Sequence, residues 1–564
     1  MALAGLAPSA GAGERARDHE LAARYLRMAN DSLTDLGTAT TADDGLVPAA
    51  DGSLELTTPA GDLDADQRPD LITIRYVPRS DFDPDLSLRY SRGYDVSVRG
   101  RRGIDGTQLW TYSEKAAALG AYPIKLASGN GVLIAAYEIN YSNLSAVYPY
   151  VYSLHLTTLT GAGDVSWQRT IAGPSAHVNF VGSAGAALPI LRGLLDAVTG
   201  PAQDVMVDTV QFVRNGRTNN HPVQIQATVF DGATGNPAST ATREQANADY
   251  YLEPFAIPGP DLDGDGLDDV LFVIQRGAEY PAALTASPAV ISASKGSNGT
   301  ELWNTQAAQF GGAVTVIPVG DATGDGKADL GVATYAPAGQ PGVFLLSGAD
   351  GSAVWSREGR EVHAIGDASG DDKPDVGVVS YSVGDDLIRI TLEGVPASGT
   401  ATYTEAHELH GVSGASSLEG FVELVGDVQP DGASDWSLHL AANFNDGRPR
   451  RESDVLASGV TGHPLRGLDR ERVLRGSITG QGDDLLRVTP HDGGGIEVTV
   501  TNGSNGNGVW NAVIGGGSPI LDTLIAAVDL DADGRDEVVV NAFTSTGTML
   551  AVLDGRDGSG LWAA

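Results

Sequence analysis

The sequence predicts an all-β protein: a β-propeller of about nine four-stranded blades, with eight blades as the alternative if one irregular unit is an insertion. Three observations point to this fold class. An acidic nine-residue loop occurs six times, an apolar run follows each copy, and a glycine turn followed by tryptophan recurs between the copies. Short strands that repeat without intervening helices are typical of propellers, although nine exceeds the usual four to eight blades. We expect the first and last blades to close the ring by direct contact, without a strand exchanged between the termini.

Composition excludes several classes of function. The chain has 564 residues and a formal net charge of −36, which argues against binding to nucleic acid or to an anionic membrane. It contains no cysteine, so disulfides, thiolate metal sites and cysteine nucleophiles are excluded. No stretch approaches the length of a transmembrane helix.

The chain is predicted to divide into an N-terminal segment, residues 1–52, and one propeller domain, residues 53–564. Residues 13–30 predict a short amphipathic helix, because Leu21, Tyr25 and Met28 follow a helical spacing. The first twelve residues resemble the end of a secretory signal, or else form a disordered leader. We therefore expect an extracellular protein, secreted or held at the cell surface.

The clearest acidic loop is residues 261–269, with the sequence DLDGDGLDD. Positions 1, 3, 5 and 9 offer carboxylate oxygens, and Leu267 at position 7 can offer only its backbone carbonyl. Gly264 and Gly266 permit the tight curl that brings these oxygens together. Hard anionic ligands on such a loop suit Ca²⁺. An EF-hand is rejected, because position 12 is Phe272 and the flanking segments predict strands.

The same spacing recurs in other parts of the chain, each time before an apolar strand. Six copies in register are far stronger evidence than one, since single Asp-rich turns are common. Irregular units near residues 128–131, 196–204 and 477–484 lack the middle ligands, and we expect them to be free of metal. The five further copies span residues 62–70, 321–329, 367–375, 427–435 and 529–537.

A second repeated signature is a turn of the form Gly-x-Asp/Asn-Gly, followed by Leu or Val and then Trp. Asp-Gly and Asn-Gly pairs predict type I′ hairpins, in which both central residues take positive φ. Six of the seven tryptophans follow this turn. We expect them to pack as wedges between neighbouring sheets, with a ligand-lining role as the alternative. The turns span residues 103–110, 161–167, 296–303, 348–355, 503–510 and 555–562.

These loops, such as DLDGDGLDD, DATGDGKAD and DLDADGRDE, resemble the FG-GAP/VCBS repeats of integrin α-chain propellers and many bacterial secreted proteins. The turn before each Trp is also similar to the tryptophan-docking repeats of quinoprotein propellers, without further signs of a quinone pocket. The FG-GAP/VCBS resemblance implies about six Ca²⁺ sites. Their ligands would be Asp62, Asp64, Asp66, Arg68 and Asp70; Asp261, Asp263, Asp265, Leu267 and Asp269; Asp321, Thr323, Asp325, Lys327 and Asp329; Asp367, Ser369, Asp371, Lys373 and Asp375; Asp427, Gln429, Asp431, Ala433 and Asp435; and Asp529, Asp531, Asp533, Arg535 and Glu537, with position 7 contributing its backbone carbonyl.

The sequence contains no recognisable catalytic constellation. The ten histidines are scattered, and His407 and His410 are expected to have structural or surface roles. There is no Gly-x-Ser-x-Gly nucleophile elbow and no phosphate-binding glycine loop followed by Lys. Whether the protein is an enzyme stays open, and a non-enzymatic role is favoured.

The favoured hypothesis is a binding, adhesion or structural module for a protein or glycan. The segment Tyr137–Tyr152, which includes Tyr141, Tyr148 and Tyr150, is the best candidate contact surface, although its tyrosines could simply pack two strands. The basic run Arg99–Arg102 is expected to be a solvated hairpin. The alternative function is a polysaccharide-active, lyase-like enzyme, for which Lys327 and Lys373 are poor candidate bases.

Overall fold

The structure is a computed structural model that describes residues 54–563, apart from 79–93, 117, 142–149, 173–187, 213–220, 249–251, 277–288, 306–313, 335–339, 385, 426, 428–430, 432, 446–447, 468–472, 481–483, 492–494, 504, 516–519 and 545–546. This part of the chain is all-β and contains no helix, and hence no helix of a length and apolarity suited to crossing a membrane. The helix and linker predicted within residues 1–52 lie outside the described residues.

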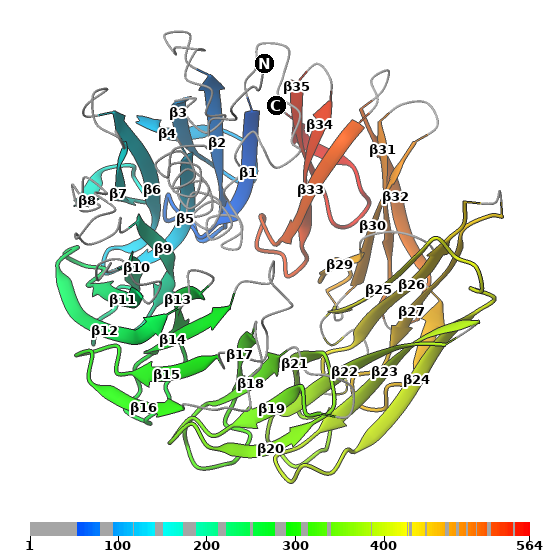
Figure 1. The fold of residues 1–564 in the computed structure, drawn as a ribbon. Coiled ribbons are helices and arrows are strands. Elements are labelled where there is room, and N and C mark those ends of the chain that lie inside the picture. The colour runs from blue at the N-terminus through cyan, green and yellow to red at the C-terminus, as the bar shows by residue number, and fades with distance from the viewer. Residues whose placement is uncertain are drawn as a thin grey trace, which may run out of the picture.

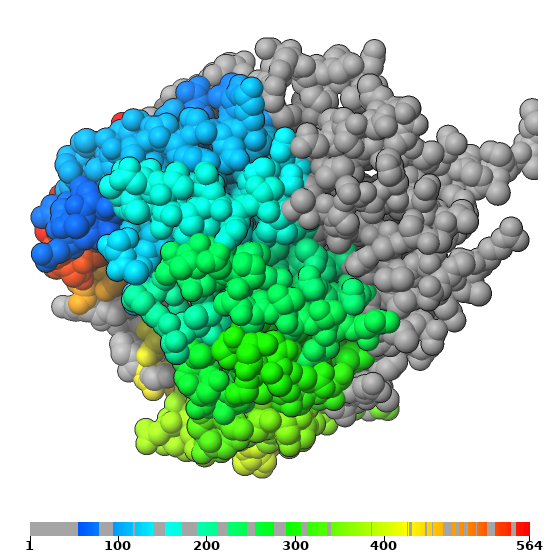
Figure 2. All heavy atoms as spheres, turned by 90° about the vertical axis from the view of Figure 1, so that its left-hand side faces the viewer, coloured from blue at the N-terminus to red at the C-terminus, as the bar shows by residue number. Residues whose placement is uncertain are grey.

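Nine four-stranded antiparallel sheets form a ring, which confirms the predicted propeller of nine blades. In every sheet the strands follow one another in chain order, the first strand lying nearest the centre of the ring and the fourth on the outside (Figure 1). Figure 2 shows one side of the ring, where successive blades lie next to each other in chain order. Blades 1 to 3 are formed by β1 (Leu54–Ala60), β2 (Asp70–Pro78), β3 (Tyr94–Arg101), β4 (Gln108–Ala116); β5 (Ala118–Leu126), β6 (Gly129–Tyr141), β7 (Tyr150–Thr160), β8 (Val165–Ala172); and β9 (Leu188–Leu195), β10 (Asp204–Phe212), β11 (His221–Phe230), β12 (Pro237–Ala248).

The position of a strand within its blade decides its burial. The second strand has another blade against each face, and every residue of β18 is buried. The fourth strand faces solvent, and β20 is mostly exposed. Blades 4 to 6 are formed by β13 (Leu252–Gly259), β14 (Asp269–Arg276), β15 (Val290–Ser294), β16 (Glu301–Thr305); β17 (Val314–Gly320), β18 (Asp329–Thr334), β19 (Val343–Leu346), β20 (Ala353–Arg357); and β21 (Glu361–Gly366), β22 (Asp375–Val383), β23 (Leu387–Val395), β24 (Tyr403–His410).

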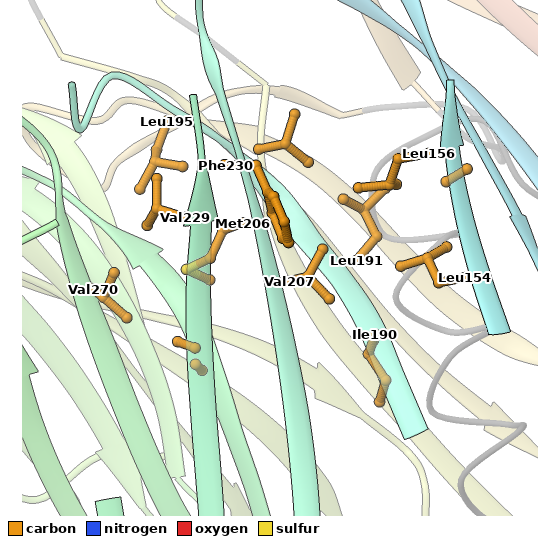
Figure 3. Packing of buried hydrophobic residues seen from close by; sticks show 14 of the residues in the cluster. Leu154, Leu156, Ile190, Leu191, Leu195, Met206, Val207, Val229, Phe230 and Val270 are labelled. Carbon is orange, nitrogen blue, oxygen red and sulfur yellow. The ribbon is translucent and has the colours of Figure 1, made fainter. Parts of the chain in front are cut away.

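The hydrophobic core lies between the blades. Figure 3 shows one such cluster, in which Leu156 of blade 2, Met206 of blade 3 and Val270 of blade 4 contribute to the same buried layer. Among the described residues, the smallest cluster joins blades 7 and 8 and consists of Val425, Leu456 and Leu485. Blades 7 to 9 are formed by β25 (Ser417–Leu424), β26 (Trp436–Asn443), β27 (Arg451–Ala457), β28 (Pro464–Gly467); β29 (Val473–Gly476), β30 (Asp484–Pro490), β31 (Ile496–Thr501), β32 (Gly508–Ile514); and β33 (Ile520–Val528), β34 (Glu537–Thr544), β35 (Gly547–Leu553), β36 (Gly560–Ala563).

The ring closes by direct contact of blades 1 and 9, as predicted. The side chain of Asn541 donates from Nδ2 to the carbonyl of Thr57 (2.9 Å), and Trp562 donates from Nε1 to the carbonyl of Gly103 (2.7 Å). Leu71 of blade 1 packs in one cluster with residues of blade 9. Each blade keeps its own four strands, so no strand is exchanged between the termini.

The tryptophan after each turn is a wedge between blades, which confirms the packing prediction. Trp303 is 6% exposed, and its Nε1 donates to the carbonyl of Gly348 in the next blade (2.6 Å). A Cβ at Gly351 would lie 2.6 Å from the Trp303 ring, so only glycine fits there. The same bond joins Trp110 to Gly161, Trp167 to Gly232, Trp355 to Pro396, Trp510 to Gly555 and Trp562 to Gly103.

Two blades that lack this tryptophan use other donors. In blade 3, Ser239 donates from Oγ to the carbonyl of Gly296. In blade 6, Tyr403 lies against Gly462, where a Cβ would be 2.8 Å from the ring, and His407 bonds through Nε2 to the Gly462 carbonyl (3.0 Å). His407 therefore has the structural role that the sequence indicated.

The prediction of type I′ turns was wrong. In blade 4, only Gly299 of the Asn298–Gly299 pair takes a positive φ, at 74°. The Lys295 N–H donates to the Thr300 carbonyl (2.8 Å), and the strand register shifts between Ala293 and Ser294. The turn is thus a longer loop with one left-handed glycine and a bulge, a geometry in which Asn or Asp need not leave its ordinary backbone region.

Candidate metal centres

The first carboxylate of each acidic loop accepts hydrogen bonds from its own loop. In blade 4, Asp261 Oδ1 accepts from the N–H groups of Gly264 (2.7 Å) and Asp265 (3.1 Å), and Oδ2 accepts from that of Gly266 (2.8 Å). These bonds wrap the backbone around the side chain. Bonds of the same kind reach position 1 in the other loops, at Asp62, Asp321, Asp367, Asp427 and Asp529.

The fifth position fixes the backbone of the seventh. In blade 4, Asp265 Oδ1 accepts from the N–H of Leu267 (3.0 Å), the residue whose carbonyl is a predicted ligand. The other loops repeat this bond, so the backbone N–H of position 7 has the same hydrogen-bond acceptor in all six. In those loops the donating backbone N–H groups belong to Arg68, Lys327, Lys373, Ala433 and Arg535.

The curl that Gly264 and Gly266 were expected to permit is present, with φ of 80° and 83°. In the loops of blades 1, 6 and 9, positions 4 and 6 take positive φ even where the residue is not glycine. A left-handed non-glycine residue costs about 1–3 kcal/mol, so the surrounding bonds must offset this strain. The non-glycine residues with positive φ in the described chain all lie in these loops: Ala65, Gln67, Asp372 and Ala532.

The ninth position has a role that the sequence did not reveal. Asp269 is 1% exposed; its Oδ2 accepts from the N–H of Leu262 (2.9 Å) and its Oδ1 from the N–H of Gly296 (3.2 Å). One carboxylate therefore ties the acidic loop to the tryptophan turn at the same end of the blade. Buried acids occupy this position in eight blades: Asp70, Asp204, Asp269, Asp329, Asp375, Asp435, Asp484 and Glu537.

Blades 3 and 8 separate this bonding role from metal binding. They lack the middle acids, yet Asp204 accepts from the N–H groups of Val198 (2.7 Å) and Gly232 (2.9 Å). Asp484 makes the equivalent bonds in blade 8. An acid at position 9 thus joins the two turns even in a loop that lacks the other cation ligands. Its presence in these irregular units is the sequence feature from which this role could have been inferred.

Burial shifts the titration of these acids. Loss of hydration raises the pKa of Asp269 to about 7, and the neighbouring Asp263 and Asp265 add to the increase, while hydrogen bonds from the backbone oppose it. Burial likewise raises the pKa of Glu537 to about 7 and that of Asp204 to about 6. A bound cation would favour the ionised forms and release protons.

Among the described residues, three loops bring three carboxylates together, with one oxygen of each within 4.8 Å of the others. This donor set suits a hard divalent cation such as Ca²⁺. The position-9 acid joins the cluster only in blade 9, through the longer Glu537 side chain. The clusters are Asp62, Asp64 and Asp66 in blade 1; Asp261, Asp263 and Asp265 in blade 4; and Asp529, Asp531 and Glu537 in blade 9.

Blades 5 and 6 each contain a buried loop oxygen without a hydrogen-bond partner, and the one in blade 5 suits a cation. The Oγ1 atom of Thr323, a predicted ligand at position 3, is buried and has no hydrogen-bond partner. The Oδ1 atom of Asp375 is also buried without a partner. Its usual donor is missing because Pro396, which has no N–H, replaces the glycine that opens the turn in other blades. In blade 7, Gln429 lies outside the described residues.

The candidate contact residues are only partly described. Tyr137 is buried, and its hydroxyl accepts from the N–H of Leu191 (3.2 Å), so this tyrosine packs the sheet. The side chains of Tyr141, Tyr148 and Tyr150 lie outside the described residues. The basic run is paired with acids: Arg99 and Arg101 lie 3.8 and 4.0 Å from Glu55, and Arg102 lies 2.7 Å from Asp64.

Comparisons with known proteins give no family. No protein-family model and no curated protein matches the sequence. Among solved structures, the chain is similar to rhamnogalacturonan lyase YesW, with 15% identity over 91% of this chain and 88% of that one and a TM-score of 0.40. A rhamnogalacturonan lyase of Bacillus licheniformis has 14% identity, coverage of 91% and 90%, and a TM-score of 0.39. A quinohemoprotein alcohol dehydrogenase of Pseudomonas putida has 12% identity, coverage of 84% and 69%, and a TM-score of 0.30.

Proposed function

We propose that this protein is a secreted or cell-surface calcium-binding propeller of the FG-GAP/VCBS kind, which serves as a binding or structural module for a protein or glycan. The observation that carries the proposal is the common architecture of the six acidic loops. In a four-stranded antiparallel blade, the loop after the first strand and the turn after the third strand lie at the same end. The acidic loops therefore lie at one rim of the ring, together with the tryptophan turns. Neighbouring loops are joined there, as when the N–H of Ala328 donates to the Asp261 carbonyl (3.0 Å).

Bound Ca²⁺ would supply charge neutralisation, and the chain supplies the rest. Carboxylates at positions 1, 3 and 5 and the carbonyl at position 7 would hold the ion, while the backbone bonds described above keep these groups in place. Extracellular modules bind Ca²⁺ with a Kd of about 10⁻⁴–10⁻³ M. At about 1 mM free Ca²⁺, a site with a Kd of about 10⁻⁴ M stabilises the folded state by about 1.4 kcal/mol.

The test is thermal unfolding with Ca²⁺, with chelator, and with Mg²⁺ as the control ion. Mg²⁺ demands a smaller octahedral site and should replace Ca²⁺ poorly. We expect the melting temperature to fall on chelation and to recover with Ca²⁺. An identical melting curve in all three conditions would contradict the proposal.

A face of blade 7 is the described surface that best fits ligand binding. Phe421 on the first strand is 48% exposed and stacks on His439, with ring centroids 4.7 Å apart and planes 25° apart. Arg450 lies beside it between Glu419 (2.9 Å) and Glu452 (3.3 Å). Because the guanidinium is already balanced by carboxylates, an aromatic platform with polar edges of this kind suits an uncharged glycan better than an acidic one.

Screening on glycan and surface-protein arrays, with and without Ca²⁺, tests this assignment. Phe421→Ala should abolish binding of the captured ligand. Val513→Ala removes another exposed apolar side chain, 51% exposed on β32, and should leave binding unchanged. Equal loss in both variants would rule out this face as the binding surface.

A polysaccharide-active enzyme is the second candidate, and one group of side chains favours it. In blade 6, Tyr381 donates from Oη to Glu361 (2.7 Å), and His363 Nε2 lies 3.4 Å from the same carboxylate. Burial raises the pKa of Tyr381, and the bond to Glu361 adds to this. However, His363 precedes Asp367 by about 13 Å of extended chain, which is far for a base that would act beside a bound Ca²⁺. An ultraviolet assay for unsaturated products from uronate polymers, with Tyr381→Phe as the control, decides the matter.

A further inference from the structure

The three loops with an acid at position 3 share a feature that the others lack. In blade 4, the Lys295 ammonium, carried by the tryptophan turn of the same blade, pairs with Asp263 and lies 3.4 Å from Asp265. These carboxylates occupy positions 3 and 5 of the acidic loop. A positive group is thus already held against two of the predicted cation ligands.

Blades 1 and 9 repeat the arrangement with arginine. Arg102 bonds to Asp64 through Nε (2.8 Å) and Nη2 (2.7 Å), and its Nε lies 3.9 Å from Asp66. In blade 9, Arg556 donates from Nε to Asp533 (2.8 Å), and its Nη2 lies 3.4 Å from Asp531. Each base comes from the tryptophan turn of its own blade and meets positions 3 and 5.

Blades 5, 6 and 7 have an uncharged residue at position 3, and their turns carry no Lys or Arg. Residues 347–352 of blade 5 read SGADGS, and residues 395–400 of blade 6 read VPASGT. Lys373 of blade 6 does reach the loop of blade 5, but its Nζ donates to the backbone carbonyl of Thr323 (3.2 Å) rather than to a carboxylate. Across six loops of one chain, the base is present where position 3 is Asp and absent where it is not.

The buried oxygens without partners follow the same division. Thr323 Oγ1 and Asp375 Oδ1 belong to the loops of blades 5 and 6. Among the described residues, no carboxylate of the loops in blades 1, 4 and 9 is buried without a partner. The loops of blades 1, 4 and 9 satisfy their oxygens internally, whereas blade 5 leaves the Thr323 hydroxyl for an external group and blade 6 leaves the Asp375 oxygen that Pro396 cannot bond.

We infer that the propeller contains two classes of cation loop. In blades 1, 4 and 9, the bases Arg102, Lys295 and Arg556 act as tethered counter-ions, which keep the loop in shape without Ca²⁺ and compete with Ca²⁺ for positions 3 and 5. The loops of blades 5 and 6 have no such substitute, so their order depends on a bound ion. This inference rests on the proposed calcium binding, whose regulation it describes.

Hydrogen exchange followed by mass spectrometry resolves the loops individually. On chelation, we expect deuterium uptake to rise in peptides that cover residues 319–334 and 365–378. Peptides that cover 60–72, 259–272 and 528–540 should change much less. A uniform rise over all five regions would overturn the inference while leaving calcium binding intact. No change anywhere would overturn the proposed function and the inference together.

Lys295→Met tests the competition directly. The variant should convert the loop of blade 4 into the ion-dependent class, so that residues 259–272 exchange faster after chelation. Its Ca²⁺ affinity at that loop should rise by about threefold to tenfold, because an ion pair of this exposure no longer opposes binding. Lys125→Met removes an exposed lysine on β5 and is the matched control, for which neither change is expected. Unchanged exchange and affinity in Lys295→Met would contradict the role of the lysine.

Discussion

The loops of blades 3 and 4 differ in their middle positions and agree at their last one. Blade 4 has Asp263 and Asp265 where blade 3 has Val198 and Gly200. Both end in a buried acid that accepts two backbone N–H groups, one from the loop and one from the turn between the third and fourth strands. The comparison separates two tasks: the final acid joins two turns of the blade, and the middle acids provide the cation ligands.

The largest expected difference between these blades lies in their outer strands. Trp303→Ala removes a buried wedge and its bond to the Gly348 carbonyl, and should lower the free energy of unfolding by about 3–5 kcal/mol. Ser239→Ala in blade 3 removes one hydrogen bond to Gly296, with an expected loss of about 0.5–1.5 kcal/mol. Denaturant unfolding measures both, and equal losses would show that the tryptophan is not a wedge.

The two final acids provide the closest comparison. Asp204→Asn and Asp269→Asn each leave one backbone N–H without an acceptor, because an amide group offers one oxygen and not two. We expect a loss of about 1–3 kcal/mol in both variants in the presence of chelator. Added Ca²⁺ should widen the deficit only for Asp269→Asn. If Ca²⁺ acts equally on both, the separation of the two tasks fails.

The pKa shifts predict how stability depends on pH without Ca²⁺. Asp204, Asp269 and Glu537 have folded-state pKa values of about 6, 7 and 7, above their ordinary values of 3.8, 3.8 and 4.5. Their contribution to the free energy of unfolding is complete below the ordinary pKa and is lost as the pH rises through the folded-state pKa. In chelator, the free energy of unfolding should therefore fall between about pH 4 and about pH 7.

Urea unfolding at several pH values in that window checks this expectation. With Ca²⁺ present the fall should be smaller, since the ion favours the ionised carboxylates. Asp204→Asn should remove its own share of the fall in both conditions, because blade 3 lacks the cation ligands. A rise in stability over this window in chelator would contradict the assigned shifts.

The smallest effect concerns blade 6. Pro396→Ala restores an N–H beside the Asp375 Oδ1 atom, which has no partner. The gain of about 1 kcal/mol from this bond is partly offset by greater freedom of the unfolded chain. Pro464→Ala on β28 lacks such an acceptor and serves as the control. Unfolding in chelator should show Pro396→Ala to be the more stable of the two variants.

The sequence was sufficient to predict nine blades because the repeated signals are local. Each acidic loop lies within nine residues and each tryptophan turn within eight; the irregular blades 2 and 8 keep the tryptophan turn, and blade 3 keeps the first and last acids of the loop. The mode of closure followed from the positions of the first and last repeats.

What the sequence did not reveal depends on contacts between distant segments. Lys295 is separated from Asp263 by 32 residues, so its pairing with the loop could not be read from spacing. The buried state of Asp269, and hence its bonds to two turns, likewise requires the assembled sheet. The type I′ prediction failed because the dipeptide Asn-Gly does not specify the bulge that follows it.

Counting bound calcium by equilibrium dialysis and elemental analysis tests the central claim most directly. We predict about six Ca²⁺ per chain in the parent protein and in Asp204→Asn, and one fewer in Asp261→Asn, which alters the position-1 ligand of the loop in blade 4. A chain that binds no calcium, or a loss in Asp204→Asn equal to that in Asp261→Asn, would contradict the account.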